Sequence, residues 1–499
     1  MAKVEATEEH LDPTSEITLE SIKERAIRGV VVLTGRTFLL SLLSLVATGF
    51  LTVFLEPSEF GVFWVVSAVV NFLAYFSDVG LAAALIQKKE EVDEADLRTT
   101  FTIQQVLVLI LLAALFFATP VLTRIYSLSA EGTFLLYALG ASLFMSSLKT
   151  IPSVLLEREL SFEKLVLPQV LENLVYNVVA VYLAWQGFGV RSFTYAVLAR
   201  GVVGLVAIYL LRPWKPGFAF SRKPLKKLLN YGVPYQANTL LATLKDDGMT
   251  AVLGGILGPA GVGLLGWAQK WGQAPLRFFM DHVIKVTFPA FSRMQDEKDH
   301  LERSVTRSIF FICFLVFPTL AGLLVLAPLL VDIIPRYEKW APALLPLGLI
   351  GINTLFAAVT TQLTNLLNAI GRIKTTFKLM VMWTVLTWLF VPFLALNYSV
   401  VGAASGYALV GTSSVVAIII ARKYVKFSLI DSVARPALAA LLLSVVALIL
   451  RARLPVSLTS VWVIVGVGAA TYLTTIYLLQ GASLTQDIKK SFKAFVSKK

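Results

Sequence analysis

Long apolar runs alternate with short polar segments along almost the whole chain. Most runs reach about 20 residues, the length that a helix needs to cross the ~30 Å hydrocarbon layer of a bilayer. A lipid-facing β-barrel would instead alternate polar and apolar residues. The pattern predicts an all-α polytopic membrane protein with about 14 transmembrane helices, near 30–55, 60–86, 99–119, 131–155, 165–186, 191–211, 228–257, 260–290, 304–331, 342–369, 374–396, 400–421, 435–451 and 458–480.

Composition supports lipid as the solvent of this chain. Of its 499 residues, 57% are hydrophobic and only 15% are charged, and the mean hydropathy is +0.76. So much apolar surface does not fit inside one water-soluble core. A single cysteine, Cys313, permits no internal disulfide, and the histidines His10, His282 and His300 are too scattered for a metal site.

The net charge of +13 is carried by residues between the hydrophobic segments, and not by a polar domain of the kind that binds nucleic acid. With the N-terminus inside, most Lys and Arg residues fall in cytoplasmic segments. The positive-inside rule therefore predicts a multi-pass protein of the cytoplasmic (inner) membrane with both termini in the cytoplasm.

A partial repeat indicates two lobes. Leu55–Gly61 and Leu257–Gly263 share a Leu-x-Pro-x-x-x-Gly frame, and the basic segment 212–227 lies between the copies. We expect an N-lobe of six helices (28–211), a basic cytoplasmic linker (212–227), a C-lobe of six helices (228–422) and two additional helices (423–480). A polar segment (1–27) and a basic tail (481–499) complete the chain.

Several charges fall inside the predicted helices. An ionised side chain in hydrocarbon costs at least ~2.5–3.5 kcal/mol, so these residues need partners or water. We interpret the cations as the lining of a substrate-binding cavity, and three acids as gate or coupling candidates: Arg36, Lys149, Arg200, Lys245, Lys270, Arg277 and Lys285, with Asp78, Glu172 and Asp281.

Alternatives remain open for several of these charges. Arg36 and Asp78 lie at similar depth, where a pair would be either a static brace or an inner gate. Arg277, Asp281 and Lys285 are spaced four residues apart, so a self-satisfied ladder on one helix competes with substrate binding.

Polar residues on two helices add to the predicted cavity. Glu172, Asn173 and Asn177 share one face of the fifth helix, and Asn365 lies on the tenth. Glu172 is a candidate for proton coupling, whereas interhelical hydrogen bonding explains the amides about as well as sugar binding does. Arg and Lys bind phosphate oxygens through charge-assisted bonds, so such a cavity suits a diphosphate with attached hydroxyls.

Two short sequence patterns match motifs of enzymes but lack the surrounding elements that those motifs need. Gly261–Gly266 fits a dinucleotide fingerprint but joins two spanning helices, and Ser146–Lys149 lacks the other elements of acyl-transfer enzymes. No outward loop is long enough for the catalytic domain of a sugar polymerase or ligase. We therefore expect no enzyme activity, no catalytic residue, no metal and no cofactor other than a coupling H⁺ or Na⁺.

Three stretches carry a family resemblance. They are Phe54–Phe63, the Phe-Ser-Asp-x-Gly-Leu-x-x-Ala-Leu-Ile-Gln run of Phe76–Gln87, and Thr361–Arg372. The chain resembles the Wzx-like oligosaccharide/polysaccharide flippase family of the multidrug/oligosaccharidyl-lipid/polysaccharide (MOP) exporter superfamily. The resemblance implies two six-helix lobes around a V-shaped cavity and alternating access.

The implied function is that of a flippase, which moves a polyprenyl-diphosphate-linked oligosaccharide, of the polysaccharide or O-antigen repeat-unit type, from the cytoplasmic to the outer leaflet. The alternatives are a MATE-like ion-coupled exporter of a soluble small molecule and a lipid II-type flippase. The expected partners are the lipid-linked substrate, membrane lipids and other polysaccharide-assembly proteins. We expect the chain to function as a monomer.

Overall fold

The computed structural model describes residues 19–88, 90–221, 236, 240, 241 and 243–480. The predicted basic tail lies outside these residues. So do most of the polar segment 1–27, residues 222–227 of the predicted linker and the beginning of the seventh predicted helix.

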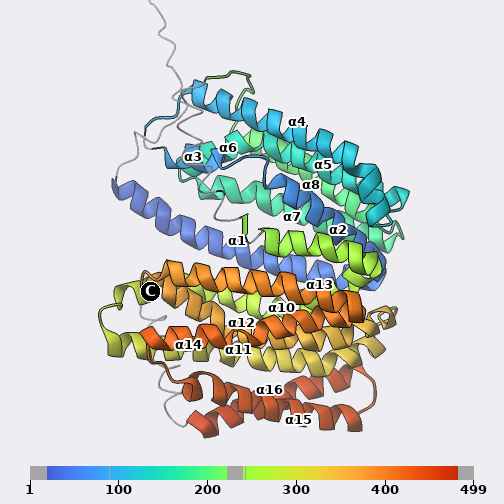
Figure 1. The fold of residues 1–499 in the computed structure, drawn as a ribbon, viewed down its shortest axis with the longest axis vertical. Helices are drawn as coiled ribbons and strands as arrows, with labels where there is room; N and C mark the ends of the chain where they lie inside the picture. Colours follow the sequence, from blue (N-terminus) through green and yellow to red (C-terminus); the bar gives the residue numbers. More distant parts are fainter. Residues whose placement is uncertain (1–18, 89, 222–235, 237–239, 242, 481–499) are drawn as a thin grey trace, which may run out of the picture. The chain divides into compact units, whose positions relative to one another are not determined.

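Regular structure in the described residues is entirely helical, which confirms the all-α class (Figure 1). Within the described residues, eleven helices, or up to twelve if one bent pair counts as a single span, are long and apolar enough to cross a membrane. The predicted count of fourteen is not confirmed. The helices are α1 (Leu19–Phe54), α2 (Pro57–Ala74), α3 (Leu81–Gln87), α4 (Glu94–Ile125), α5 (Ala130–Leu148), α6 (Thr150–Arg158), α7 (Phe162–Trp185), α8 (Arg191–Leu211), η2 (Leu244–Gly248), α10 (Met249–Arg293), α11 (Lys298–Ile333), η3 (Glu338–Ala343), α12 (Leu344–Ala369), α13 (Ile373–Thr412), α14 (Val415–Tyr424), η4 (Ile430–Ala434), α15 (Arg435–Arg453) and α16 (Leu458–Gln480).

Backbone breaks separate helical segments at several points. α10 contains Gly258 with φ 66° and ψ 177°, and α13 contains Ser399 with φ 53°. Both breaks lie where the apolar pattern predicts the end of one helix and the start of the next. The predicted helix 60–86 is instead divided into α2 and α3, because the turn between them holds Val79 at φ 50° and Gly80 at φ 75°. These values lie in the left-handed region, which ends a right-handed helix.

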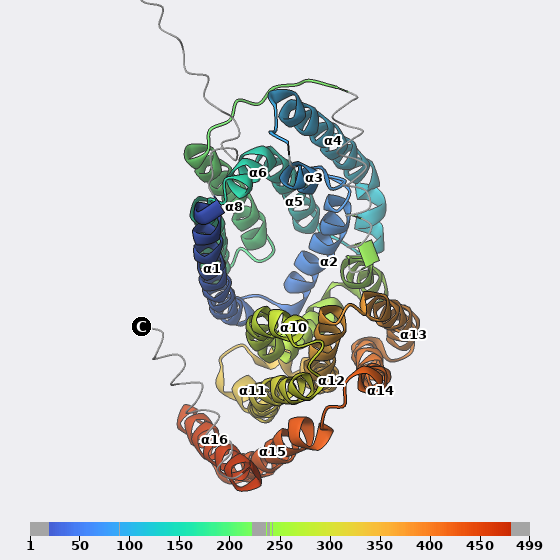
Figure 2. The same ribbon diagram turned by 90° about the vertical axis from the view of Figure 1, so that its left-hand side faces the viewer.

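The chain forms two compact units, Met1–Gly263 (unit 1) and Leu264–Lys499 (unit 2). The predicted lobe boundary at 212–227 stays a prediction. Within unit 1, α7 packs against α1 and α8, and α5 packs against α2, α4 and α8. Figure 2 shows these unit 1 helices from one end.

The first ten residues of the predicted linker pack onto unit 1. Trp214 lies in a buried cluster with Leu81, Leu97 and Ile151, and its ring contacts that of Phe101 at 5.2 Å between centroids. The Arg212 guanidinium pairs with Glu159 at 3.0 Å, and the backbone N–H of Ala219 donates to the Thr102 hydroxyl. Burial of an indole is among the larger apolar contributions that one residue makes. This part of the segment is therefore part of the fold of unit 1.

Unit 2 is built around α11. Ile312, Cys313 and Val316 on this helix are fully buried, and they share a core with Leu366 of α12 and Tyr472 of α16. α15 and α16 pack against each other and against α11. Cys313 is thus a core residue.

The two copies of the Leu-x-Pro-x-x-x-Gly frame meet within unit 1. A Cβ on Gly61 would lie 1.6 Å from the carbonyl oxygen of Pro259, and a Cβ on Gly263 would lie 1.7 Å from that of Pro57. Only glycine permits backbones to approach so closely. Each turn therefore packs against the proline of the other copy through its own glycine.

A cationic cavity as the candidate functional site

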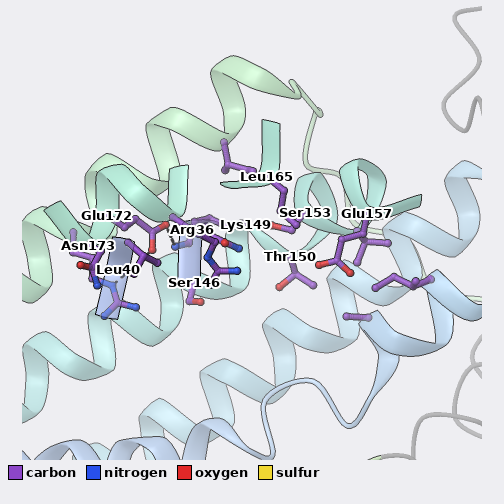
Figure 3. A pocket seen from close by; sticks show the side chains of 16 residues that line it. Arg36, Leu40, Ser146, Lys149, Thr150, Ser153, Glu157, Leu165, Glu172 and Asn173 are labelled. Atoms are coloured by element: carbon purple, nitrogen blue, oxygen red, sulfur yellow. Dashed lines mark hydrogen bonds and ion pairs between the residues drawn. The ribbon is translucent and has the colours of Figure 1, made fainter. Parts of the chain in front are cut away.

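Unit 1 contains a cavity of about 520 Å³, within the range of roughly 300–1,000 Å³ that small-molecule sites occupy. Six helices line it, and the side chains labelled in Figure 3 converge on it. The lining residues are Arg36 and Leu40 of α1; Ala82 and Ile86 of α3; Ser146 of α5; Lys149 at the α5–α6 joint; Thr150, Ser153, Val154 and Glu157 of α6; Leu165, Gln169, Glu172 and Asn173 of α7; and Arg200 and Ile208 of α8.

A bend places Lys149 in this lining. α5 and α6 meet at 41°, and Pro152 stands in the first turn of α6. Proline has no N–H, so it cannot bond the carbonyl of Leu148 four residues earlier. The hydroxyl of Tyr209 on α8 donates to that carbonyl at 3.0 Å instead. The bent joint is thereby tied to α8, and Lys149 at the joint lines the cavity.

Glu172 holds two of the cations. Its carboxylate lies 2.6 Å from the Lys149 ammonium and 3.7 Å from Nε of Arg200, and its side chain is only 12% exposed. A Cβ on Gly204 would lie 1.8 Å from Oε1 of Glu172, so the glycine on α8 provides the space for this carboxylate. A buried charge needs such compensation to remain ionised.

Arg36 is a third cation at this end of the cavity. Its Nε is buried and has no hydrogen-bond partner, and no ion pair of Arg36 occurs among the described residues. Three cations therefore face the single carboxylate of Glu172. A buried donor without an acceptor is costly, so an acceptor group that reached this end of the cavity would complete the hydrogen bonding of Arg36.

The other predicted residues of unit 1 have different surroundings. The Asp78 carboxylate accepts the backbone N–H of Ala82, at 3.2 and 3.3 Å for its two oxygens, because the turn at 75–80 directs it to the start of α3. The predicted pair with Arg36 is not formed. Asn173 lines the cavity, whereas Asn177 is buried and donates to Asn173 on the same helix. Lys245 in η2 pairs with its neighbour Asp246 at 2.8 Å.

The remaining predicted residues belong to unit 2. Lys270, Arg277 and Lys285 are exposed on α10, where Arg277 donates to Gln273 one turn earlier at 3.0 Å. Asp281 lies on the same helix, with its side chain outside the described ones. Asn365 of α12 is buried and donates to the Thr287 hydroxyl at 2.9 Å. These residues are not part of the cavity of unit 1.

The sequence-based site did not include the polar residues of α6. Thr150, Ser153 and Glu157 line the cavity, but the predicted fourth helix ends at 155 and leaves Glu157 in a loop. A signal for them exists, since polar residues recur every three or four positions from Ser146 to Glu157, the spacing of one helix face.

The chain has many helices that are long and apolar enough to span a membrane, and charged side chains from several of them line one cavity. These features define a multi-pass helical membrane protein with a polar cavity. The family model described as polysaccharide biosynthesis protein matches residues 50–345, more than half of the chain. This chain therefore belongs to the polysaccharide biosynthesis protein family, and the family resemblance of the sequence is confirmed.

Two curated relatives are similar over most of their length. The succinoglycan biosynthesis transport protein ExoT of Rhizobium meliloti (strain 1021) is 26% identical over 401 residues, which are 79% of this chain and 80% of the relative. The lipopolysaccharide biosynthesis protein WzxC of Escherichia coli (strain K12) is 24% identical over 386 residues, 77% of each chain.

Solved structures share the fold. The lipid II flippase MurJ in its inward closed conformation matches with a TM-score of 0.73 at 15% identity, over 90% of this chain and 98% of the other. An inward-facing multidrug resistance MATE family transporter of the MOP superfamily matches with a TM-score of 0.59 at 20% identity, over 79% and 97% of the two chains. The predicted MOP-type fold is thereby confirmed.

Proposed function

We propose that this protein is a flippase for a polyprenyl-diphosphate-linked oligosaccharide of the polysaccharide or O-antigen repeat-unit type. It moves the lipid from the cytoplasmic to the outer leaflet by alternating access. The observation that carries the proposal is the group of three cations around the largely buried carboxylate of Glu172, in which Nε of Arg36 has no hydrogen-bond partner. Membership of the polysaccharide biosynthesis protein family and the transport role named for the relative ExoT support the same function.

The chemistry of the cavity suits a diphosphate. Its oxygens accept charge-assisted hydrogen bonds, and the planar guanidinium groups of Arg36 and Arg200 offer the paired donors that phosphate geometry matches. Glu172 forms ion pairs with Lys149 and Arg200. Incoming phosphate competes with Glu172 for these two cations, while the polyprenyl tail stays in the bilayer.

Transport by such a protein needs binding and rocking of two lobes, and no catalytic residue. The proposed setting is the inner membrane, with both termini in the cytoplasm and with one chain sufficient for transport. No metal or organic cofactor enters the proposal. Other polysaccharide-assembly proteins are proposed to supply the lipid-linked substrate and to take up the translocated product.

Proton or sodium exchange is the proposed energy source, with Glu172 as the first coupling residue and Asp281 as the second. Protonation of Glu172 removes its charge and frees Lys149 and Arg200 for phosphate. We expect an imposed proton gradient to accelerate transport by the native protein and to have no effect on Glu172→Gln. Equal acceleration of both proteins would exclude this role for Glu172.

Reconstitution tests the proposed function. The full chain in liposomes is given a fluorescent polyprenyl-diphosphate oligosaccharide, and its appearance on the far leaflet is measured. Because each cation is expected to contribute a charge-assisted bond, the triple variant Arg36→Ala, Lys149→Ala, Arg200→Ala is expected to lose at least 90% of the rate. Arg124→Ala and Lys164→Ala, at exposed positions outside the cavity, are the matched controls.

The same assay separates the alternatives. A MATE-like exporter of a soluble cation would retain its transport when the three cations are removed. A lipid II-type flippase would transport the lipid-linked peptidoglycan precursor faster than a lipid-linked polysaccharide repeat unit. Unchanged flipping by the triple variant would refute the proposed role of the cavity.

A further inference from the structure

The cavity has two chemically different ends. Arg36, Lys149 and Glu172 gather at one end in Figure 3, and Thr150, Ser153 and Glu157 lie toward the other. The first end presents mainly donors with positive charge. The second presents hydroxyl groups and a carboxylate, so a ligand that fills the whole cavity needs acceptors at one end and donors at the other.

Glu157 is the carboxylate of the second end. It lies half-buried in the last turn of α6, and in the part of the chain that the structure describes its carboxylate makes no hydrogen bond or ion pair. The charges next to it in sequence are engaged elsewhere. Arg158 is buried and donates to the carbonyls of Leu85 and Lys88, at 2.8 Å each, and Glu159 pairs with Arg212.

Gln169 supplies a second acceptor, whose oxygen receives no hydrogen bond. It lies one turn before Glu172 on α7, nearer the start of that helix and therefore nearer the end of α6. Its Oε1 is buried and has no hydrogen-bond partner. Unsatisfied buried acceptors are rare in folded proteins, and this one lines the cavity together with the half-buried carboxylate of Glu157.

We infer that Glu157 and Gln169 form a subsite for the sugar that is attached directly to the diphosphate. This inference rests on the proposed function and adds an orientation of the cargo to it. Sugar hydroxyls are hydrogen-bond donors, which both acceptors lack. An ionised phosphate offers no donor and is repelled by the Glu157 carboxylate. The diphosphate therefore lies at Arg36, Lys149 and Arg200, with the first sugar toward Glu157.

The hydroxyls of the lining complete this subsite. Thr150 already accepts from the Gln104 amide at 2.8 Å, so its oxygen is fixed in place, and Ser153 lies one helical turn before Glu157. A carboxylate that accepts two neighbouring hydroxyls distinguishes sugars by the arrangement of those hydroxyls. Glu157 thus determines which first sugar is accepted, whereas the cations bind any diphosphate.

Two ligands of equal charge separate the contributions of the two ends. Binding to the purified full chain in detergent is measured for a short-chain prenyl diphosphate that carries one hexose, and for the methyl ester of the same prenyl diphosphate. Glu157→Ala is expected to weaken binding of the hexose ligand about tenfold, the typical loss of a hydrogen bond to a charged group. Binding of the methyl ester is expected to stay unchanged or to become tighter, because a repelling carboxylate is gone.

Three further variants make the test specific. Gln169→Leu is expected to reproduce the selective loss, Glu157→Gln is expected to show a smaller loss because it keeps one acceptor, and Glu91→Gln is the exposed control outside the cavity. Because the Glu157 carboxylate has no hydrogen-bond or ion-pair partner among the described residues, Glu157→Ala is also expected not to lower the midpoint of thermal unfolding.

The outcomes are distinguishable. Equal weakening of both ligands, or a lowered unfolding midpoint, would show that Glu157 supports the fold and would refute the subsite. Unchanged binding of the hexose ligand by both Glu157→Ala and Gln169→Leu would refute it as well. If the triple cation variant binds both ligands as the native protein does, the proposed function itself fails, whatever the result at Glu157.

Discussion

At the scale of single residues, the central contact of the cavity is the one between Glu172 and the backbone of α8. The carboxylate occupies the space that a side chain at position 204 would fill, and from there it reaches Lys149 and Arg200. The position of the carboxylate therefore depends on Gly204, a residue of another helix.

Gly204→Ala tests this dependence. The new Cβ would lie 1.8 Å from Oε1 and 2.3 Å from Cδ of Glu172, so the carboxylate has to move away from its cations. We expect a loss of about 1–3 kcal/mol of stability, the usual range for overpacking, measured as a lower midpoint of thermal unfolding in detergent. Gly322→Ala, where a Cβ would have no neighbour within 4 Å, is the control.

A second substitution tests whether the loss of stability comes from the contact between the new Cβ and Glu172. Glu172→Asp shortens the side chain by one methylene, so it is expected to restore part of the loss in the Gly204→Ala background. An equal loss with and without Glu172→Asp would show that the alanine acts by another route.

The sequence predicts which residues of this site are charged and buried, but not how they pair. Lys149, Glu172 and Arg200 stand out because ionised groups are rare in apolar runs. They lie on three different helices, and the pattern of one helix contains no information on which faces meet. The sequence does not single out Gly204 for the same reason, since an apolar segment contains many glycines without any such role.

At the scale of elements, the joint between α5 and α6 shapes the cavity. Pro152 leaves the Leu148 carbonyl without its helical partner, and Tyr209 of α8 supplies the missing donor. The bend is thus stabilised by a side chain from a different helix. A bend of this kind turns Lys149 and the polar face of α6 toward the same cavity.

Tyr209→Phe is expected to loosen the joint. Removal of the hydroxyl leaves the Leu148 carbonyl unpaired, at a cost of about 1 kcal/mol, which would appear as a drop of about one degree in the thermal unfolding midpoint of a chain of this length. Tyr182→Phe, at a ring that is 56% exposed, is the control. In a Pro152→Ala background, the restored N–H can bond Leu148, so Tyr209→Phe should then cost less. An undiminished cost there would contradict the explanation.

Apolar patterning predicts helices well in this chain and their internal breaks less well. The breaks at Gly258 and Ser399 coincide with the ends of predicted helices because polar or proline-containing segments interrupt the pattern there. The turn between α2 and α3 does not coincide with a predicted helix end. Residues 75–80 follow an apolar run, and the break depends on the positive φ of Val79 and Gly80. Hydrophobicity does not encode a backbone angle.

At the scale of the whole molecule, the repeated Leu-x-Pro-x-x-x-Gly turns matter most. Their similarity along the sequence predicts two related halves, and in the structure the copies contact each other through Gly61 and Gly263. The sequence shows that the motif recurs. It does not show that the glycine of each copy packs against the proline of the other, because these residues are about 200 positions apart in the chain.

Gly61→Ala and Gly263→Ala are each expected to destabilise the protein by about 1–3 kcal/mol. In both cases the new Cβ would meet a backbone carbonyl, which cannot rotate away as a side chain would. Thermal unfolding of the purified variants measures the effect. Gly49→Ala on α1, where a Cβ would find nothing within 4 Å, should leave the midpoint unchanged or raise it.

Because each glycine accommodates the opposite turn, the two substitutions are not independent. Once the first alanine has pushed the turns apart, the second finds room already made, and a double-mutant cycle should yield a combined loss well below the sum of the single losses. Strict additivity would mean that the turns adjust separately. Negative coupling of this size would make the two turns of the duplicated motif one thermodynamic unit, in which a change in either turn is partly absorbed by the other.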